Sequence, residues 1–316
     1  MSSNRPHSAD GADDVEALWQ SHRRRMLDIG YRMLGSVTDA EDVAAEAYAR
    51  LIAADRDDID EPVGWLVAVT ARLCVDRLRS AEIRKRAYVG PWLPEPLVET
   101  AASPMIDPAD RVTLDDSVRM ALLVVLEQLS PAERTSFVLH DLFAISFDEI
   151  ADIVGRSPAA CRQLASRARR RIQSDPDRPR TAVSADEAEA IAQRFAQACS
   201  RGELEPLIEL LDPAAIGDFD SGGTIPGAPR QAIDGAEHIA RVLVRSFSGR
   251  DFSFSVTNVN GEPGVVVNLD TQVMAVIAIG VRAGRIDLIH AIGNPAKLLH
   301  VGTTGPRRTR IDEHHR

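Results

Sequence analysis

The sequence predicts a multidomain chain in which two all-α domains, the second containing a helix-turn-helix, precede an α+β domain. Helical periodicity of the apolar residues over 13–88 predicts the first domain, and the pattern SFDEIADIVGRSPAACRQLASRARRRI at 146–172 predicts the helix-turn-helix. Alternating β-rich runs after residue 250 predict the sheet of the third domain. A length of 316 residues suits this number of domains, because one domain takes roughly 100 to 200 residues.

The first all-α domain is expected over residues 13–88, after a disordered start at residues 1–12. Its first helix is expected to end near Gly35, and Thr38 and Glu41 form a capping box that opens the second helix. Pro62, at a favoured first helical position, starts a third long helix. The pattern therefore predicts three helices and no strand in this domain.

A proline-rich linker is expected at residues 89–116, because five prolines in VGPWLPEPLVETAASPMIDPAD exclude a continuous helix. Its WLPEP motif places two apolar side chains between prolines that order the backbone. The motif is therefore either plain linker or a docking element, and its residues are Trp92, Leu93, Pro94, Glu95 and Pro96. A second linker is expected at 176–183.

The second all-α domain, residues 117–175, carries repeated helix-start signals. These signals are Ser130 with Pro131 and Glu133, Ser146 with Glu149, and Ser157 before Pro158. Gly155 can adopt the left-handed conformation that ends one helix and turns the chain into the next. We interpret the segment as a helix-turn-helix, the alternative being a helical hairpin with a basic face.

The α+β domain is expected over residues 184–300, followed by a flexible tail at 301–316. Ser184 with Glu187 and Asp234 with Glu237 are expected to cap two of its three helices. Strands are expected in FSFSV, GVVVNL, QVMAVIAIGV and around IDLIHAI. This order of elements indicates a bent sheet wrapped on helices.

Positive charge is concentrated in two places on a chain whose net charge is −10. Six arginines and no acidic residue lie between Arg156 and Ser174. The second basic cluster comprises Arg77, Arg79, Arg84, Lys85 and Arg86. A solvated surface helix normally mixes charges of both signs, so clusters of one sign point to a polyanion. The sequence therefore predicts two contacts on one nucleic acid.

The composition excludes several other classes of protein. No apolar run approaches the roughly 20 residues that span a bilayer, and the first dozen residues lack the apolar core of a signal peptide. We therefore expect a cytoplasmic protein without membrane contact. Cys74, Cys161 and Cys199 lie far apart without metal-ligand spacing, so we expect them to be buried and expect neither metal nor cofactor.

With these residues in view, the chain resembles bacterial sigma factors of the extracytoplasmic-function group. LGSVTDAEDVAAEAYARL and PVGWLVAVTARLCVDRLRSAEIRKR, within residues 15–88, resemble the second conserved region of these proteins. LEQLSPAERTSFVLHDLFAISFDEIADIVGRSPAACRQLASRARRRI, within 117–173, resembles the fourth. The C-terminal part is similar to SnoaL-like domains, a cone-shaped α+β fold that one subgroup carries together with a WLPEP linker.

The resemblance implies a role for each cluster. An acidic helix face would bind core RNA polymerase through Asp39, Glu41, Asp42 and Glu46. The promoter's minus-ten element would meet Trp65, Arg77, Arg79, Arg84, Lys85 and Arg86, although Trp65 also fits a core position. The minus-thirty-five element would meet Arg156, Ser157, Arg162, Gln163, Ser166, Arg167, Arg169, Arg170 and Arg171. Residues near the helix start would touch base edges, and 169–171 would grip phosphate.

Three functions are open for the SnoaL-like domain. It acts as an intramolecular regulator that folds over the linker or the second DNA-reading domain, as a small-molecule sensor, or as an enzyme. The groups available for catalysis would be Asp218, Asp220, His238 and His290, but likeness of fold is only an analogy for function. The subgroup usually has a glycine-rich motif ending in lysine where this chain has DSGGT at 220–224, whereas NPAKL at 294–298 fits its pattern.

We interpret the chain as an alternative sigma factor that brings core RNA polymerase to promoter DNA, has no catalytic activity, and is modulated by its fused C-terminal domain. The rival hypothesis is a ligand-responsive helix-turn-helix regulator that binds duplex DNA without polymerase. Such regulators usually dimerise on palindromes. Two different basic clusters in one chain favour asymmetric promoter binding instead.

Overall fold

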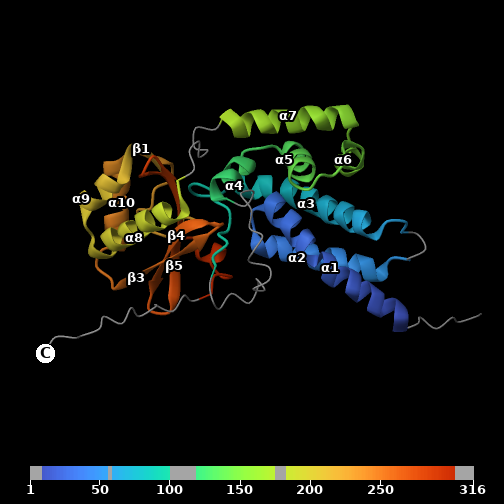
Figure 1. Ribbon diagram of the computed structural model, residues 1–316, viewed down its shortest axis with the longest axis horizontal. Coiled ribbons are helices and arrows are strands. Elements are labelled where there is room, and N and C mark those ends of the chain that lie inside the picture. The colour runs from blue at the N-terminus through green and yellow to red at the C-terminus, as the bar shows by residue number, and fades with distance from the viewer. Residues whose placement is uncertain (1–8, 56–58, 100–118, 175–182, 303–316) are drawn as a thin grey trace, which may run out of the picture. The chain divides into compact units, whose positions relative to one another are not determined.

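The computed structural model describes residues 9–55, 59–99, 119–174 and 183–302. These residues form two compact units, the first from residues 1–87 and 122–178 and the second from 88–121 and 179–316 (Figure 1). Residues 1–8, most of the predicted linkers (100–116 and 176–182) and most of the predicted tail (303–316) lie outside the described part.

The first unit opens with helices α1 (Ala9–Leu34), α2 (Val37–Ala53) and α3 (Pro62–Arg86), which pack on one another as predicted. Helix α1 includes residues 9–12, which we expected to be disordered; the acids of ADGADDVEA suit a helix start. The capping box expected at Thr38 was wrong: Ser36 is the N-cap and accepts from the Asp39 amide at 3.0 Å.

The second half of this unit contains α4 (Met120–Glu127), α5 (Pro131–Phe137), the π-helix η4 (Val138–Leu142), α6 (Phe147–Val154) and α7 (Pro158–Ser174). Both capping boxes predicted here, at Ser130 and Ser146, are present. The helix-turn-helix prediction is confirmed in α6 and α7. The π-helix was not foreseen; such segments often occur at functional sites.

Arg134 of α5 joins the two halves of the first unit. Its guanidinium donates to the Met33 carbonyl at the end of α1 and to the Glu127 carboxylate of α4, both at 2.9 Å. The side chains of Arg134 and Glu127 are only 2% and 7% exposed. Burial lowers the pKa of Arg134 to about 9, so the residue stays charged at neutral pH. Helix α3 packs against α5 and α6 in the same unit.

The second unit is an α+β fold. Its helices are α8 (Ala185–Arg201), α9 (Leu204–Leu210) and α10 (Ala236–Phe247). Its strands are β1 (Leu211–Asp220), β2 (Ile233–Asp234), β3 (Phe252–Val259), β4 (Glu262–Leu269), β5 (Gln272–Arg282) and β6 (Arg285–Ile292). They form one sheet in the order β2-β1-β6-β5-β4-β3, in which β1 and β6 are parallel and the other pairs antiparallel.

One cap of this unit differs from expectation. Ser184 caps α8 as predicted and accepts from the Glu187 amide at 3.2 Å. Helix α10, however, begins after Gly235, which has a φ of 92° and offers no side-chain cap, so the expected cap at Asp234 was wrong. Asp234 instead belongs to β2, where it pairs with Ile216 of β1.

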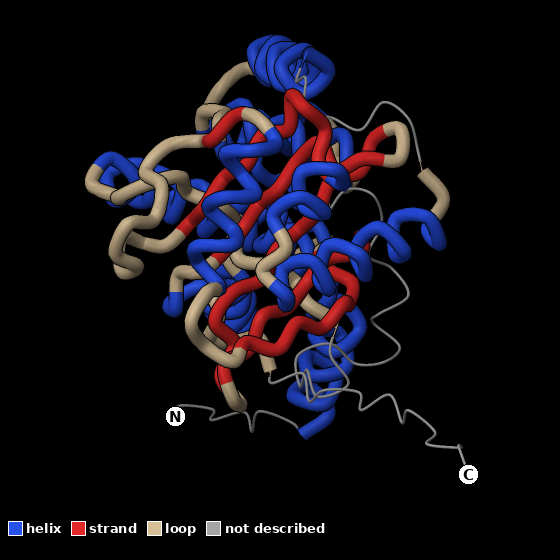
Figure 2. Tube along the Cα trace, turned by 90° about the vertical axis from the view of Figure 1, so that its left-hand side faces the viewer, coloured by secondary structure: helices blue, strands red, loops and turns tan. Residues whose placement is uncertain are grey.

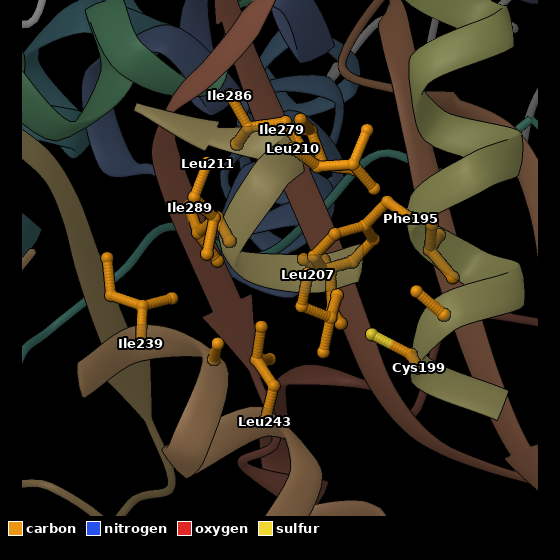
Figure 3. Packing of buried hydrophobic residues seen from close by; sticks show 14 of the residues in the cluster. Phe195, Cys199, Leu207, Leu210, Leu211, Ile239, Leu243, Ile279, Ile286 and Ile289 are labelled. Carbon is orange, nitrogen blue, oxygen red and sulfur yellow. The ribbon is translucent and has the colours of Figure 1, made fainter. Parts of the chain in front are cut away.

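The helices cover one face of the sheet, and apolar side chains fill the space between them (Figures 2 and 3). Phe195 and Cys199 of α8, Leu207 of α9 and Leu243 of α10 meet Ile289 of β6 in this core, each with at most 4% exposure. Because strand side chains alternate between faces, the neighbouring His290 belongs to the opposite face of the sheet. The three cysteines of the chain are free and buried, as expected.

Candidate nucleic-acid interface and linker contacts

The turn of the helix-turn-helix is built by local backbone chemistry. Gly155 has a φ of 72°, and its amide donates to the Ala151 carbonyl at 2.9 Å, which closes α6. The Ser157 hydroxyl accepts from the Ala160 amide at 3.2 Å and so caps α7. The apolar face of α7 is buried. Its exposed face carries the predicted DNA-binding residues Arg162, Gln163, Ser166, Arg167, Arg170 and Arg171, and the predicted residues Arg156 and Ser157 are exposed just before the helix.

The arginines of α7 differ in the side chains of this protein that they already contact. Arg169 is only partly exposed and makes two hydrogen bonds to the Asp141 carboxylate, at 2.7 and 2.6 Å, which raise its pKa. Arg167 lies 3.4 Å from Glu133. The guanidinium carbon of Arg162 lies 5.4 Å from the centre of the Phe147 ring. A phosphate would have to compete with Asp141 for Arg169.

The second basic cluster, Arg77 to Arg86, is divided between structural and exposed residues. Arg77 donates to the Asp39 carbonyl at 2.6 Å and lies 3.9 Å from the Asp42 carboxylate, so it holds α3 against the start of α2. Arg79 has 63% of its side chain exposed and lies 3.5 Å from Asp76. Trp65 is half-buried. The side chains of Arg84, Lys85 and Arg86 lie outside the described part of the structure.

The structure brings the two basic clusters to one place that the sequence did not indicate. A cavity of about 430 Å³ in the first unit is lined by Arg79 of α3 together with Arg156 and Arg167. Glu133 also lines this cavity, so its charged residues are three arginines and one glutamate, and its other lining residues are neutral.

The predicted polymerase-binding acids lie in the first three turns of α2. Asp42 has 64% of its side chain exposed, and Glu46 is 43% exposed and paired with Arg50 at 2.7 Å. Asp39 and Glu41 are half-buried. The apolar residues of the helix, including Val43 and Ala47, face the core, so the acids remain on its outer side.

In the second unit, the WLPEP motif lies against the C-terminal domain. Asp220, only 1% exposed, accepts from the Leu93 amide at 3.0 Å, from the Gly222 amide at 3.1 Å and from the Tyr88 hydroxyl. Asn294 donates to the same hydroxyl at 2.7 Å. One buried carboxylate therefore holds both ends of the segment 88–93.

Lys297 completes this contact. Its ammonium lies 2.7 Å from Asp220, donates to the Leu93 carbonyl and sits 3.6 Å from the centre of the Trp92 ring. Burial lowers the pKa of Lys297, and the nearby Asp220 carboxylate opposes that shift. The ring of Tyr88 packs edge-on against Trp92, with centroids 4.6 Å apart. DSGGT lacks the subgroup's lysine, but NPAKL supplies a lysine to its aspartate.

The following linker residues pair with the end of β3. The Asn260 amide donates to the Leu97 carbonyl at 2.7 Å, and its side chain accepts from the Leu97 amide at 3.0 Å. Val98 forms a β-bridge with Val259, and the Glu99 amide donates to Asn258 at 3.0 Å. His300 lies 2.8 Å from the Pro96 carbonyl. Linker residues 93–96 and 98 are thereby buried.

Sequence reasoning missed most of the partners of the linker. Lys297 and Asn294 were noted only as part of NPAKL, and Asn260 and Tyr88 were not singled out. The one available signal was that two short motifs, WLPEP and NPAKL, occur together in one chain, about 200 residues apart.

The four candidate catalytic groups do not form one site. Asp220 is bound to the linker, and His238 is exposed on α10, whereas His290 and Asp218 are paired residues on β6 and β1. The Nε2 atom of His290 lies 3.6 Å from the Asp218 carboxylate. This pair faces away from the helical core.

The pair should make the second unit sensitive to acid. Burial lowers the pKa of His290 from 6.5 to about 4 despite the nearby carboxylate. The unfolded chain therefore takes up a proton between these values that the folded chain does not, and stability should fall by up to about 3 kcal/mol as the pH drops from 6.5 to 4. H290Q should flatten this part of the unfolding free energy against pH. H238Q, at an exposed histidine, should leave it unchanged; equal slopes in H290Q and wild type would contradict the assignment.

No helix in the described ranges is both long and apolar enough to cross a membrane. No group of three or more His, Cys, Asp or Glu side chains among the described residues could hold a metal ion.

Comparison with known proteins agrees with this arrangement. Residues 18–83 match the family Sigma-70 region 2, and residues 119–172 match Sigma-70, region 4. The chain is 38% identical to the probable ECF RNA polymerase sigma factor SigI of Mycobacterium tuberculosis, over 90% of this chain and 95% of that protein. It is 36% identical to SigJ of the same species, over 90% of this chain and 92% of SigJ.

The crystal structure of Mycobacterium tuberculosis SigJ superposes with a TM-score of 0.70 at 32% identity, covering 90% of this chain and 98% of SigJ. The likeness thus extends through both sigma regions and the C-terminal α+β domain. The chain belongs to the extracytoplasmic-function (ECF) family of RNA polymerase sigma factors.

Proposed function

We propose that this sigma factor directs core RNA polymerase to promoters through two separate DNA contacts, one from α7 and one from the C-terminal half of α3. The observation that carries the proposal is the capped helix-turn-helix whose second helix exposes a row of arginines on a chain of net charge −10. The net negative field disfavours indiscriminate binding, so affinity has to come from these local clusters.

Within α7, position along the helix separates base reading from phosphate binding. Helix-turn-helix proteins place the N-terminal part of the recognition helix at base edges. Arg162 and Gln163 are exposed there, and we assign them to the minus-thirty-five bases. Arg170 and Arg171 are exposed near the helix end, and we assign them to phosphates. Arg169, bound by Asp141, is the weakest candidate for a DNA contact.

On the minus-ten side, Arg79 is the best supported contact, because Arg77 is already bound to Asp39 and Asp42. We also assign Arg84, Lys85 and Arg86 to the minus-ten contact, because of their positive charge alone. Trp65 is half-buried, which allows both a core role and a stacking role. The outer face of α2, with Asp42 and Glu46, is proposed to bind the polymerase.

Run-off transcription with purified core polymerase tests these assignments. R162A should lower initiation on a cognate promoter roughly 5- to 100-fold and relax selectivity at one minus-thirty-five base pair, because a bidentate base contact contributes about 1–3 kcal/mol. R170A should weaken all sequences alike and reduce the salt slope by about one. R194A, at an exposed arginine of α8, is the matched control. Absence of transcription with the wild-type chain would refute the proposal itself.

We further propose that the C-terminal domain regulates initiation by holding the linker between the two DNA-binding regions. The contacts of residues 88–99 with Asp220, Asn260 and Lys297 support this reading. Apolar side chains occupy the interior between the sheet and its helices, which favours linker control over a ligand held in that space. The rival hypothesis, a regulator that works without polymerase, predicts repression or activation independent of sigma activity and fails if run-off transcription succeeds.

A further inference from the structure

The strongest feature that the proposed function leaves unused is an aromatic contact beneath the recognition helix. His140 lies in the π-helix η4, Phe147 is the first residue of α6, and Arg162 lies on α7. The rings of His140 and Phe147 are stacked, with centroids 3.9 Å apart and planes inclined by 28°. The guanidinium of Arg162 lies over the Phe147 ring at 5.4 Å. Three consecutive elements thus converge on one arginine.

Backbone groups fix the position of the His140 ring. The Nδ1 atom of His140 lies 2.9 Å from the Ile145 carbonyl, so this nitrogen carries the proton and donates. The Ile145 amide in turn donates to the Leu139 carbonyl at 2.9 Å, and the Ala144 amide to the His140 carbonyl at 3.1 Å. The turn after the π-helix therefore orients the imidazole, and the imidazole orients the phenyl ring.

The kind of contact matters for what Arg162 can still do. Asp141 accepts from two N–H groups on one edge of the Arg169 guanidinium and neutralises its charge locally, and the Glu133 carboxylate lies close to Arg167. The Phe147 ring offers Arg162 its face and no carboxylate, which leaves the charge and the N–H donors of the guanidinium available for a base edge. An arginine side chain has many rotamers, so holding its guanidinium in place in advance reduces the entropy lost on binding.

We infer that Phe147, supported by His140, is a positioning residue that holds the guanidinium of Arg162 in place for reading one base pair of the minus-thirty-five element. The inference rests on the proposed function, in which Arg162 contacts a base. Neither ring needs to touch DNA for this role.

The test is a double-mutant cycle with the reconstituted holoenzyme, transcribing a promoter library randomised over the minus-thirty-five element. R162A identifies the base pair whose selectivity depends on Arg162. F147L keeps an apolar side chain but removes the ring face, and should reduce selectivity at that same base pair by about two- to fivefold, the range expected for an exposed cation–π contact. In the R162A background, F147L should have no further effect on it.

Three more variants separate positioning from folding. F147Y retains the ring and should restore wild-type selectivity, whereas H140L should act in the same direction as F147L. F143L removes a neighbouring ring that contacts Arg32 instead, and should leave selectivity unchanged. Thermal unfolding of each chain identifies any variant whose loss is due to misfolding, and F147Y then decides in place of F147L.

The outcomes distinguish this inference from the function beneath it. If R162A changes selectivity but F147L acts additively with it, or lowers transcription equally on every sequence, the positioning role is wrong and the base contact stands. If R162A alters selectivity at no position, the proposed base contact itself fails.

Discussion

Replacing Asp220 with alanine should release the WLPEP linker and strongly destabilise the second unit. The change would leave the Lys297 ammonium, 7% exposed, without its carboxylate and would remove the acceptor for the Leu93 amide. Breaking a buried ion pair by removing one partner costs about 3–5 kcal/mol, because the remaining charge is uncompensated. Denaturant unfolding should report this loss, and hydrogen exchange should show faster exchange at the linker amides of Leu93, Leu97 and Glu99.

Two controls separate the ion pair from general damage. D251A, at an exposed aspartate of the same unit, should change stability by less than about 0.5 kcal/mol. The double variant D220A/K297M removes both charges and should recover much of the stability, since an apolar pair of similar volume is often neutral. A D220A chain as stable as wild type, with unchanged exchange in the linker, would show that the pair does not hold it. Run-off transcription with D220A should also differ from wild type if the linker carries regulation.

Replacing Arg134 with methionine should have an effect of similar size in the first unit. The Glu127 carboxylate would remain buried without its guanidinium, and the Met33 carbonyl would lose its donor. The expected loss is again about 3–5 kcal/mol. Because Arg134 links α5 to the end of α1, the loss should appear as earlier unfolding of the first unit in denaturant.

The matched control is R72A, at an exposed arginine of α3. It should stay within about 0.5 kcal/mol of wild type. The double variant R134M/E127L should be more stable than R134M alone, since no buried charge is left unpaired. If R134M alone unfolds like wild type, the buried pair is not an energetic link between the sigma regions.

The helix starts at Ser130, Ser146 and Ser184 could be predicted from sequence, because a cap depends on side chains within three residues of one another. The same holds for the turn at Gly155, whose left-handed backbone is a local property of glycine. Local reasoning failed where two candidates lay close together. Ser36, not Thr38, caps α2, because α1 ends at Leu34 and leaves Ser36 extended.

The identity of the DNA-reading helix and the clustering of basic residues followed from sequence, because charge and periodicity are written along the chain. The sequence did not show which arginines are already bound by other residues of the chain. Arg77 contacts Asp39, Arg169 contacts Asp141 and Arg134 contacts Glu127 only after the helices pack.

The linker contact needed the tertiary structure most of all. Asp220 and Lys297 are 77 positions apart, and the Leu93 that they bind lies on the other side of both sigma region 4 and two helices of the C-terminal domain. A sequence determines capping, periodicity and charge because these depend on near neighbours. The pairing of buried charges depends on which strand ends and loops the fold brings together, and only the folded chain decides that.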